Sequence, residues 1–104
     1  MQVSKTKTFD KWLRGLKNNR AKAAVLFRVL RIQEKNLLGD FKRVGTDLYE
    51  LRIHLSPGYR VYFTQKGKEI ILLIGGGTKR TQQSDIEKAK KLLKQINNDG
   101  NHNF

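Results

Sequence analysis

The chain has 104 residues, with 22 Lys and Arg against 9 Asp and Glu and a formal net charge of +13. This length predicts one domain with one hydrophobic core, which we place at residues 1–96, followed by a disordered tail at residues 97–104. The absence of cysteine excludes a disulfide framework, a cysteine-ligated zinc site and a thiol nucleophile. The charge favours an acidic partner, and nucleic acid is the first candidate.

Targeting and membrane-spanning signals are missing from the sequence. The N-terminal residues lack the apolar core of a signal peptide, and the longest apolar runs, Ala23–Phe27 and Ile70–Ile74, are too short to cross a bilayer. We therefore expect a cytoplasmic protein without membrane contact. No group of His, Asp and Glu residues has metal-ligand spacing, so neither a metal nor another cofactor is expected.

The predicted elements follow the order β-α-α-β-β-β-β-α, beginning with a short strand over Gln2–Lys7. A first helix should follow, with Thr8 as its N-cap. Its apolar residues recur at i, i+3, i+4 and i+7, namely Phe9, Trp12, Leu13 and Leu16.

A second helix is predicted from Arg20 to Lys35, capped by Asn18-Asn19. It carries a wide apolar arc of Val25, Leu26, Val29, Leu30 and Ile32. The opposite arc carries a basic stripe of Arg20, Arg28, Arg31 and Lys35. Because the link between the helices is short, they should form a hairpin packed on one face of a sheet.

From Gly39 onward the apolar period changes from 3.6 to 2, which is typical of strands. Strands are predicted at Phe41–Val44, Tyr49–Leu55, Tyr59–Thr64 and Glu69–Ile74. The turns between them are Gly45-Thr46-Asp47, Ser56-Pro57-Gly58 and Lys66-Gly67. The last of these strands is apolar on both sides, which indicates a central buried strand.

The C-terminal part of the pattern is a glycine run followed by a helix. Gly75-Gly76-Gly77 is expected to end the preceding strand. The final helix should begin near Thr81–Ser84, where Ser84-x-x-Glu87 has the spacing of a capping box. The stretch Gly75–Arg80 does not fit the Walker phosphate-loop pattern.

Alternation along the two middle strands gathers polar side chains on one sheet face. If the apolar residues of these strands face the helices, the residues between them face away from the helices. This set is Glu50, Arg52, His54, Arg60 and Tyr62. The loop after the next strand can add Lys79 and Arg80.

Phosphoryl transfer is the chemistry that this set suits. Arginine binds phosphate in a planar, bidentate way, histidine can exchange a proton near neutral pH, and Tyr62 could stack on an unpaired base. The alternative is that this is a solvated sheet face whose charges have no catalytic role.

Two stretches together resemble a known family. The first includes Tyr49-Glu50-Leu51-Arg52-Ile53-His54 and Pro57-Gly58-Tyr59-Arg60-Val61-Tyr62-Phe63, and the second begins Gly76-Gly77-Thr78-Lys79. The sequence resembles the addiction-module killer proteins, a HigB-like branch of the RelE/ParE toxin superfamily, over nearly its whole length.

The resemblance implies an α+β, RelE-like fold. Its mostly antiparallel sheet of about four to five strands would have the N-terminal helical hairpin on one face and be followed by a C-terminal helix. It also implies the toxin of a type II toxin–antitoxin system, a ribosome-dependent mRNA interferase that needs no metal. Its partners would be the ribosome, mRNA and a cognate helix-turn-helix antitoxin, with operator DNA contacted only through the antitoxin complex.

The site residues follow from the face pattern and the resemblance together. We assign catalysis to Arg60, Arg52, Lys79 and His54, and RNA binding to Arg80, Tyr62, Lys42 and Arg43.

The sequence departs from the family at the proton-transfer residue. RelE-type relatives carry a tyrosine or histidine early in the last helix, where this chain has Ser84-Asp85-Ile86. Proton transfer would then fall to His54, Glu50, Lys79 or Asp85, or this branch cleaves poorly. The alternatives are a ParE-like inhibitor of DNA gyrase and a basic nucleic-acid-binding module without catalysis.

Overall fold

The computed structural model describes residues 1–68 and 70–98. Over these residues the elements are β1 (Gln2–Lys5), α1 (Lys7–Gly15), α2 (Asn19–Lys35), β2 (Phe41–Gly45), β3 (Leu48–Ile53), β4 (Tyr59–Lys66), β5 (Ile70–Thr78), a short 3₁₀ turn (Lys79–Thr81) and α3 (Gln82–Asn98). The predicted order of strands and helices and the α+β class are confirmed.

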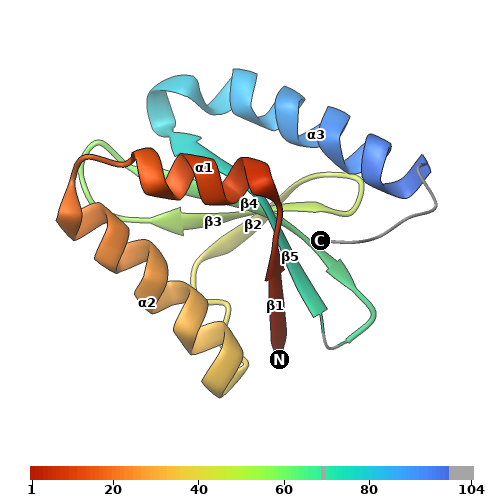
Figure 1. The fold of residues 1–104 in the computed structure, drawn as a ribbon, viewed down its shortest axis with the longest axis horizontal. Coiled ribbons are helices and arrows are strands. Elements are labelled where there is room, and N and C mark those ends of the chain that lie inside the picture. The colour runs from red at the N-terminus through yellow and green to blue at the C-terminus, as the bar shows by residue number, and fades with distance from the viewer. Residues whose placement is uncertain (69, 99–104) are drawn as a thin grey trace.

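The described strands form one five-stranded sheet in the order β1-β5-β4-β3-β2 (Figure 1). β1 pairs with β5 in parallel, whereas the β5-β4, β4-β3 and β3-β2 pairs are antiparallel. The prediction of a mostly antiparallel sheet is therefore confirmed. β5 lies between β1 and β4, and Ile71–Ile74 are fully or almost fully buried, as expected for an interior strand.

Helices cover both faces of the sheet. On one face α1 and α2 contribute Phe9, Ala21, Val25 and Ile32 to a cluster that also holds Leu51, Val61, Phe63, Ile71 and Leu73. On the other face α3 packs Ala89 and Leu93 against Leu48, Tyr62, Leu72 and Ile74. The predicted helical hairpin on one face is confirmed, and the opposite face is not fully open, because α3 lies on it (Figure 1).

The start of α1 differs from the prediction, because the N-cap is Thr6 rather than Thr8. The Thr6 hydroxyl accepts a hydrogen bond from the Phe9 N–H at 3.1 Å and donates one to the Ile74 carbonyl at 2.7 Å. The Thr6 N–H also donates to the Leu73 carbonyl at 3.0 Å. Thr6 is thus fixed to β5 in an extended conformation, and β1 ends at Lys5, two residues before the predicted end at Lys7.

The glycine run does not end β5, contrary to the prediction. Gly75, Gly76 and Gly77 pair with Tyr62, Val61 and Arg60, and the strand continues to Thr78. This pairing has a bulge between Tyr62 and Phe63, whose partners on β5 are Gly75 and Leu73. Ile74 is therefore an extra residue, and the alternation of β5 side chains between the two faces of the sheet shifts at this point. Virtual side chains at Gly76 and Gly77 would meet Trp12 of α1 and Asp85 of α3, respectively.

The predicted capping box of α3 is also wrong, because Ser84 lies inside the helix. The residue that organises this end is Thr81, whose hydroxyl accepts from the Thr78 N–H at 3.3 Å and donates to Asp85 at 2.5 Å. α3 continues to Asn98, so the first two residues of the predicted tail are helical. The rest of that tail, residues 99–104, lies outside the described residues. Within the described part of the chain, no helix has the length and hydropathy needed to cross a membrane.

Candidate functional site

The centre of the candidate site is a buried carboxylate on β3. Glu50 has no exposed surface, and the pairing register places it opposite Tyr62 on β4 and Lys42 on β2. Arg52 lies directly opposite Arg60. Residues directly opposite in an antiparallel sheet point to the same face, so the register confirms that Glu50, Arg52, Arg60 and Tyr62 share a face.

Glu50 holds side chains from three elements. Its Oε1 lies 3.3 Å from Nε of Arg52, which donates a hydrogen bond to it, and 3.4 Å from Nε of Arg60. Its Oε2 accepts a hydrogen bond from Nε2 of Gln82, the first residue of α3, at 2.7 Å. A buried charge is tolerated only when it is paired and hydrogen-bonded, so the two arginines and Gln82 keep this carboxylate in place.

The two arginines differ in their access to solvent. The Arg60 side chain is 12% exposed and that of Arg52 is 32% exposed. Nε of Arg60 has no hydrogen-bond partner within the described chain, so its contact with Glu50 is an ion pair without hydrogen-bond geometry. Glu50 therefore neutralises part of the positive charge of the two arginines from the buried side, while the exposed part of the Arg52 side chain can still contact an anion.

Lys79 joins this group through the turn between β3 and β4. Its N–H donates to the Gly58 carbonyl at 2.8 Å. A virtual Cβ on Gly58 would lie 3.5 Å from Cβ of Lys79 and 3.6 Å from Nη1 of Arg60, which places Gly58 between them. Gly58 has φ +90°, a left-handed conformation that favours glycine, as the predicted turn required.

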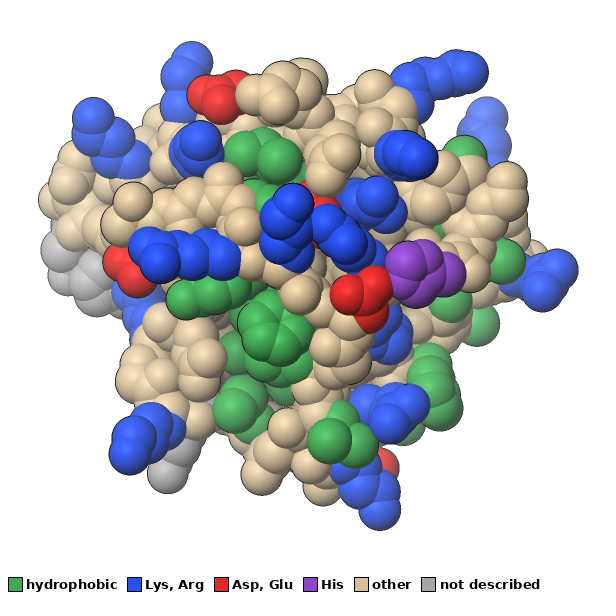
Figure 2. Space-filling view, turned by 180° about the vertical axis from the view of Figure 1, so that it is seen from behind, with side chains coloured by type: hydrophobic (Ala, Val, Ile, Leu, Met, Phe, Trp, Pro, Cys, Tyr) green, Lys and Arg blue, Asp and Glu red, His purple; other side chains and the backbone are tan. Residues whose placement is uncertain are grey.

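Figure 2 shows Lys and Arg side chains gathered in the middle of one face of the molecule, beside a histidine and an acidic side chain. We call Arg52, Arg60 and Lys79 the basic cluster. Among residues 1–68 and 70–98, no group of three or more His, Asp or Glu side chains is placed to hold a metal ion.

The expectation that Tyr62 offers an exposed ring for base stacking is wrong. The side chain is fully buried in the cluster beneath α3. Burial raises the pKa of the Tyr62 phenol, and the nearby negative charges of Glu50 and Asp85 raise it further. Tyr62 is thus a neutral core residue whose position depends on the packing of α3.

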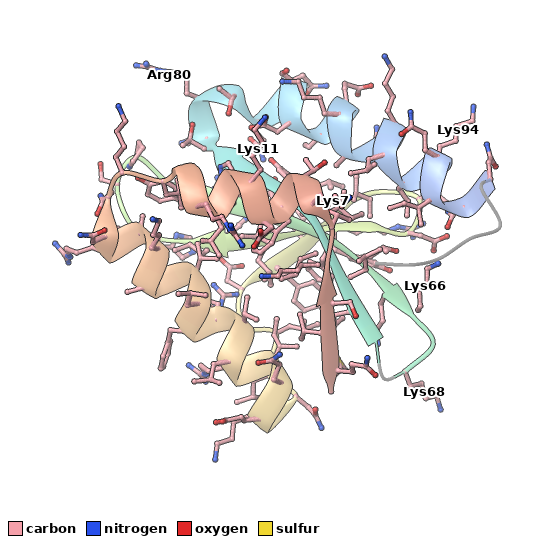
Figure 3. The ribbon with its side chains drawn as sticks, viewed as in Figure 1. Lys7, Lys11, Lys66, Lys68, Arg80 and Lys94 are labelled. Carbon is pink, nitrogen blue, oxygen red and sulfur yellow. The ribbon has the colours of Figure 1, made fainter. Side chains whose placement is uncertain are left out.

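The other predicted RNA-binding residues do not lie together. Lys42 shares the face of Glu50, its partner on β3, but the next residue, Arg43, pairs with Tyr49 on the opposite face and donates to the Gly45 carbonyl at 3.1 Å. Arg80 lies in the turn before α3 and projects outward from it (Figure 3). The structure therefore places Lys42 on the same face as the basic cluster, places Arg43 on the other face, and leaves Arg80 exposed.

His54 is paired with a residue that the sequence pattern did not single out for chemistry. Its Nε2 lies 2.5 Å from Oδ2 of Asp40, and its side chain is 73% exposed. The hydrogen bond with His54 lowers the pKa of the Asp40 carboxyl, and the charges of His54, Arg52 and Arg28 lower it further. An exposed imidazole held by a carboxylate has the chemistry needed to exchange a proton with a substrate.

Arg28 of α2 positions this pair. It donates to the carbonyls of Arg52 and Leu38 at 2.6 Å each and of Asp40 at 3.0 Å. The predicted basic stripe of the second helix thus includes one structural residue, since Arg28 fixes the loop that carries Asp40. Gln82 and Asp40 are the two site residues that the sequence pattern missed, because their partners are distant in the chain.

We expect the replacement His54→Ala to raise the pKa of Asp40 toward the ordinary carboxyl value. In the wild type this pKa is lowered, so the pair adds stability above the ordinary carboxyl pKa. That stability is lost as pH falls through the lowered value. Carboxyl ¹³C chemical shifts followed through a pH titration would measure the change.

Asp10 is the matched control for this titration. Its pKa is lowered by the hydrogen bond from Lys5 and the charge of Arg14, so it should not respond to His54→Ala. An Asp40 titration that is identical in the wild type and the variant would contradict the pairing.

Comparison with known proteins gives a family and a fold. Residues 11–94 match the family described as phage-derived Gp49-like protein. An uncharacterized protein of Haemophilus influenzae is 44% identical over 96 residues, which cover 92% of this chain and 96% of that protein.

Several solved structures share the fold. A chain of the intact E. coli RelBE toxin–antitoxin complex has a TM-score of 0.61 and 18% identity, covering 74% of this chain and 94% of that one. A chain of the RelB–RelE antitoxin–toxin complex from Methanococcus jannaschii has a TM-score of 0.63 and 20% identity, covering 79% of this chain and 96% of that one. A mutant of the E. coli toxin RelE in the free state has a TM-score of 0.66 and 18% identity, covering 91% of this chain and 96% of that one. At these identities the likeness establishes the RelE-like fold alone.

Proposed function

The chain belongs to the phage-derived Gp49-like family, and from this premise we propose that it is the toxin of a type II toxin–antitoxin pair that cleaves messenger RNA on the ribosome. Three features support this proposal. The fold is that of RelE chains from toxin–antitoxin complexes. The net charge of +13 suits a ribosomal and RNA environment. The basic cluster supplies cations where a phosphate would be bound.

The observation that carries the proposal is the pairing of Arg52 and Arg60 above buried Glu50. The two guanidinium groups come from directly opposite positions of β3 and β4, and the shared carboxylate restrains both. Preorganised charge around a reacting phosphate usually contributes more to catalysis than any other single effect. A cluster that only kept the surface soluble would not need an anion buried beneath it.

The proposed reaction is attack of the ribose 2′-oxygen on the adjacent phosphorus, with loss of the 5′-oxygen of the next nucleotide. Arg60 and Arg52 would hold the non-bridging oxygens and stabilise the pentacoordinate transition state. Lys79 would stabilise the charge that develops on the leaving 5′-oxygen, which takes a proton from solvent water, and the proton that His54 accepts from the 2′-hydroxyl returns to solvent. The products would be a 2′,3′-cyclic phosphate and a free 5′-hydroxyl.

Proton transfer is assigned to His54. Glu50 is occupied by Arg52, Arg60 and Gln82. Asp85 is hydrogen-bonded to Thr81. His54 is exposed and has Asp40 on Nε2 to orient its ring. It would accept the proton of the 2′-hydroxyl through Nδ1, while Asp40 stabilises the imidazolium that forms, as in other histidine–carboxylate pairs.

Primer extension on a translated message tests the proposal. In a cell-free translation system, the wild type should produce new 5′ ends only when ribosomes are loaded, and Arg60→Ala should not produce them. Arg14→Ala is the matched control, since Arg14 is 79% exposed and paired with Asp10 on α1. It should cleave like the wild type.

A message that stays intact under active translation would overturn the nuclease proposal. Supercoiling assays with DNA gyrase would then test the ParE-like alternative, and filter binding to RNA would test a binding module without catalysis. The gyrase alternative predicts that Arg60→Ala keeps its toxicity.

A further inference from the structure

The outer face of α2 exposes large apolar side chains. Leu26, Phe27 and Leu30 are 53%, 58% and 46% exposed. Within residues 1–68 and 70–98, the other exposed large hydrophobic residues are Leu37 and Phe41, so all of them fall in one short segment. Contiguous exposed apolar surface of this kind marks an interaction site more often than a free surface.

The three side chains form one stripe along the helix. Positions 26, 27 and 30 lie within one turn of each other on the side of α2 away from Ala21, Val25 and Ile32, which are fully buried. The wide apolar arc predicted for this helix is thus only partly buried. Val25 and Ile32 lie in the core, whereas Leu26 and Leu30 are exposed. Figure 1 shows α2 at the periphery of the fold, with the sheet on its inner side.

Charged residues around this stripe indicate what covers it. Arg20, Arg31 and Lys35 are exposed on α2, where Glu34 is the acidic residue. The guanidinium carbon of Arg31 lies 5.7 Å from the centre of the Phe27 ring, a cation–π contact. A cation held at the edge of the apolar stripe favours a partner that brings carboxylates to the rim and apolar side chains to the centre.

A second copy of the chain would not meet this requirement. It would bring the same cations against Arg20 and Arg31, and each copy carries a net charge of +13, so the contact would be repulsive. A lipid surface is disfavoured because Arg31 covers part of the Phe27 ring that would have to enter the acyl region. An acidic amphipathic helix meets both the apolar and the charged part of the surface.

We propose that Leu26, Phe27 and Leu30 form the docking site for an acidic amphipathic helix of the antitoxin. The inference rests on the proposed function, since a toxin of this type requires an antitoxin. The docked helix packs its apolar side chains against the stripe and pairs its carboxylates with Arg20 and Arg31. This surface lies on the α1/α2 side of the sheet, whereas the basic cluster lies on the side of α3.

Affinity for the protein encoded beside this chain tests the site. The Kd is measured by calorimetry for the wild type and for the double variant Leu26→Ser/Leu30→Ser, which should bind at least about 100-fold more weakly. Leu37→Ser is the matched control, because Leu37 is equally exposed but follows the left-handed cap of α2 at Asn36. It should change the Kd by less than about threefold.

A charge variant keeps the test independent of folding. Arg31→Glu alters one exposed side chain and should weaken binding by about tenfold. If the double variant and Arg31→Glu bind as tightly as the wild type, the docking site is overturned. Loss of a dimer in the double variant, or its loss of binding to vesicles of phosphatidylglycerol, would also overturn it in favour of a second copy or a membrane.

The cleavage assay separates this inference from the proposed function. Leu26 and Leu30 lie outside the basic cluster, so the free double variant should cleave ribosome-bound message like the wild type. Cleavage together with unchanged antitoxin affinity would overturn the docking site alone. Lost affinity in a protein that cleaves nothing would support the docking site and overturn the nuclease proposal.

Discussion

Glu50→Gln is expected to lower the free energy of unfolding by about 3 to 5 kcal/mol. The side chain keeps its size, but Arg52 and Arg60 lose the anion between them. Arg60 is the main source of the loss, because only 12% of its side chain is exposed and water cannot replace Glu50 as its partner. Urea unfolding followed by circular dichroism would measure the change.

Asp10→Asn is the matched control for this prediction. Asp10 also pairs with two cations, Lys5 and Arg14, at 2.8 and 2.9 Å, but their side chains are 57% and 79% exposed. Exposed ion pairs contribute about 1 kcal/mol or less, so Asp10→Asn should have a much smaller effect. Equal losses in the two variants would show that burial does not give the Glu50 pairs their strength.

The same substitution should also reduce the proposed cleavage, although Glu50 does not face the RNA. Glu50 is a positioning residue that acts through Arg52 and Arg60. If cleavage is measured well below the unfolding temperature of Glu50→Gln, this variant should therefore be folded and still cleave less message than the wild type. The conservative replacement Glu50→Asp, which keeps the charge, should restore part of the activity.

The element order could be predicted from the sequence because it depends on local patterns. The change of apolar period near Gly39 marks the boundary between the helical hairpin and the strands. The Pro57-Gly58 turn sets the β3-β4 register, and this register places Arg52 opposite Arg60. Each of these features depends on a short stretch of neighbouring residues.

The errors in the prediction come from contacts between distant parts of the chain. β5 continues through its glycines because they pair with β4, which their local propensity does not show. Alternation placed Glu50 and Tyr62 on one face but could not show that α3 covers it. The bond from Gln82 to Glu50 spans 32 positions, so no local pattern could reveal it.

Gly76→Ala is expected to lower the free energy of unfolding by about 2 to 3 kcal/mol. A Cβ at this position would lie 2.5 Å from Cδ2 of Trp12, well inside contact distance. Relieving this overlap would displace the Trp12 ring, which also packs against Phe9, with ring centroids 5.9 Å apart. α1 would therefore have to move away from β5.

Gly75→Ala provides the control in the neighbouring position of the same strand. The nearest atom to its virtual Cβ is Cγ2 of Thr8 at 3.9 Å, an ordinary contact. This variant should be neutral or more stable by up to about 1 kcal/mol, because alanine reduces the entropy of the unfolded chain. Thermal unfolding of both variants would show the difference.

Tryptophan fluorescence adds a local readout, because Trp12 is the only tryptophan in the chain. Its emission should shift in Gly76→Ala and stay unchanged in Gly75→Ala. If both variants unfold and fluoresce alike, Trp12 does not pack on Gly76. The glycine at position 76 would then be explained by the strand alone, whereas a selective effect would show that it allows α1 to approach β5.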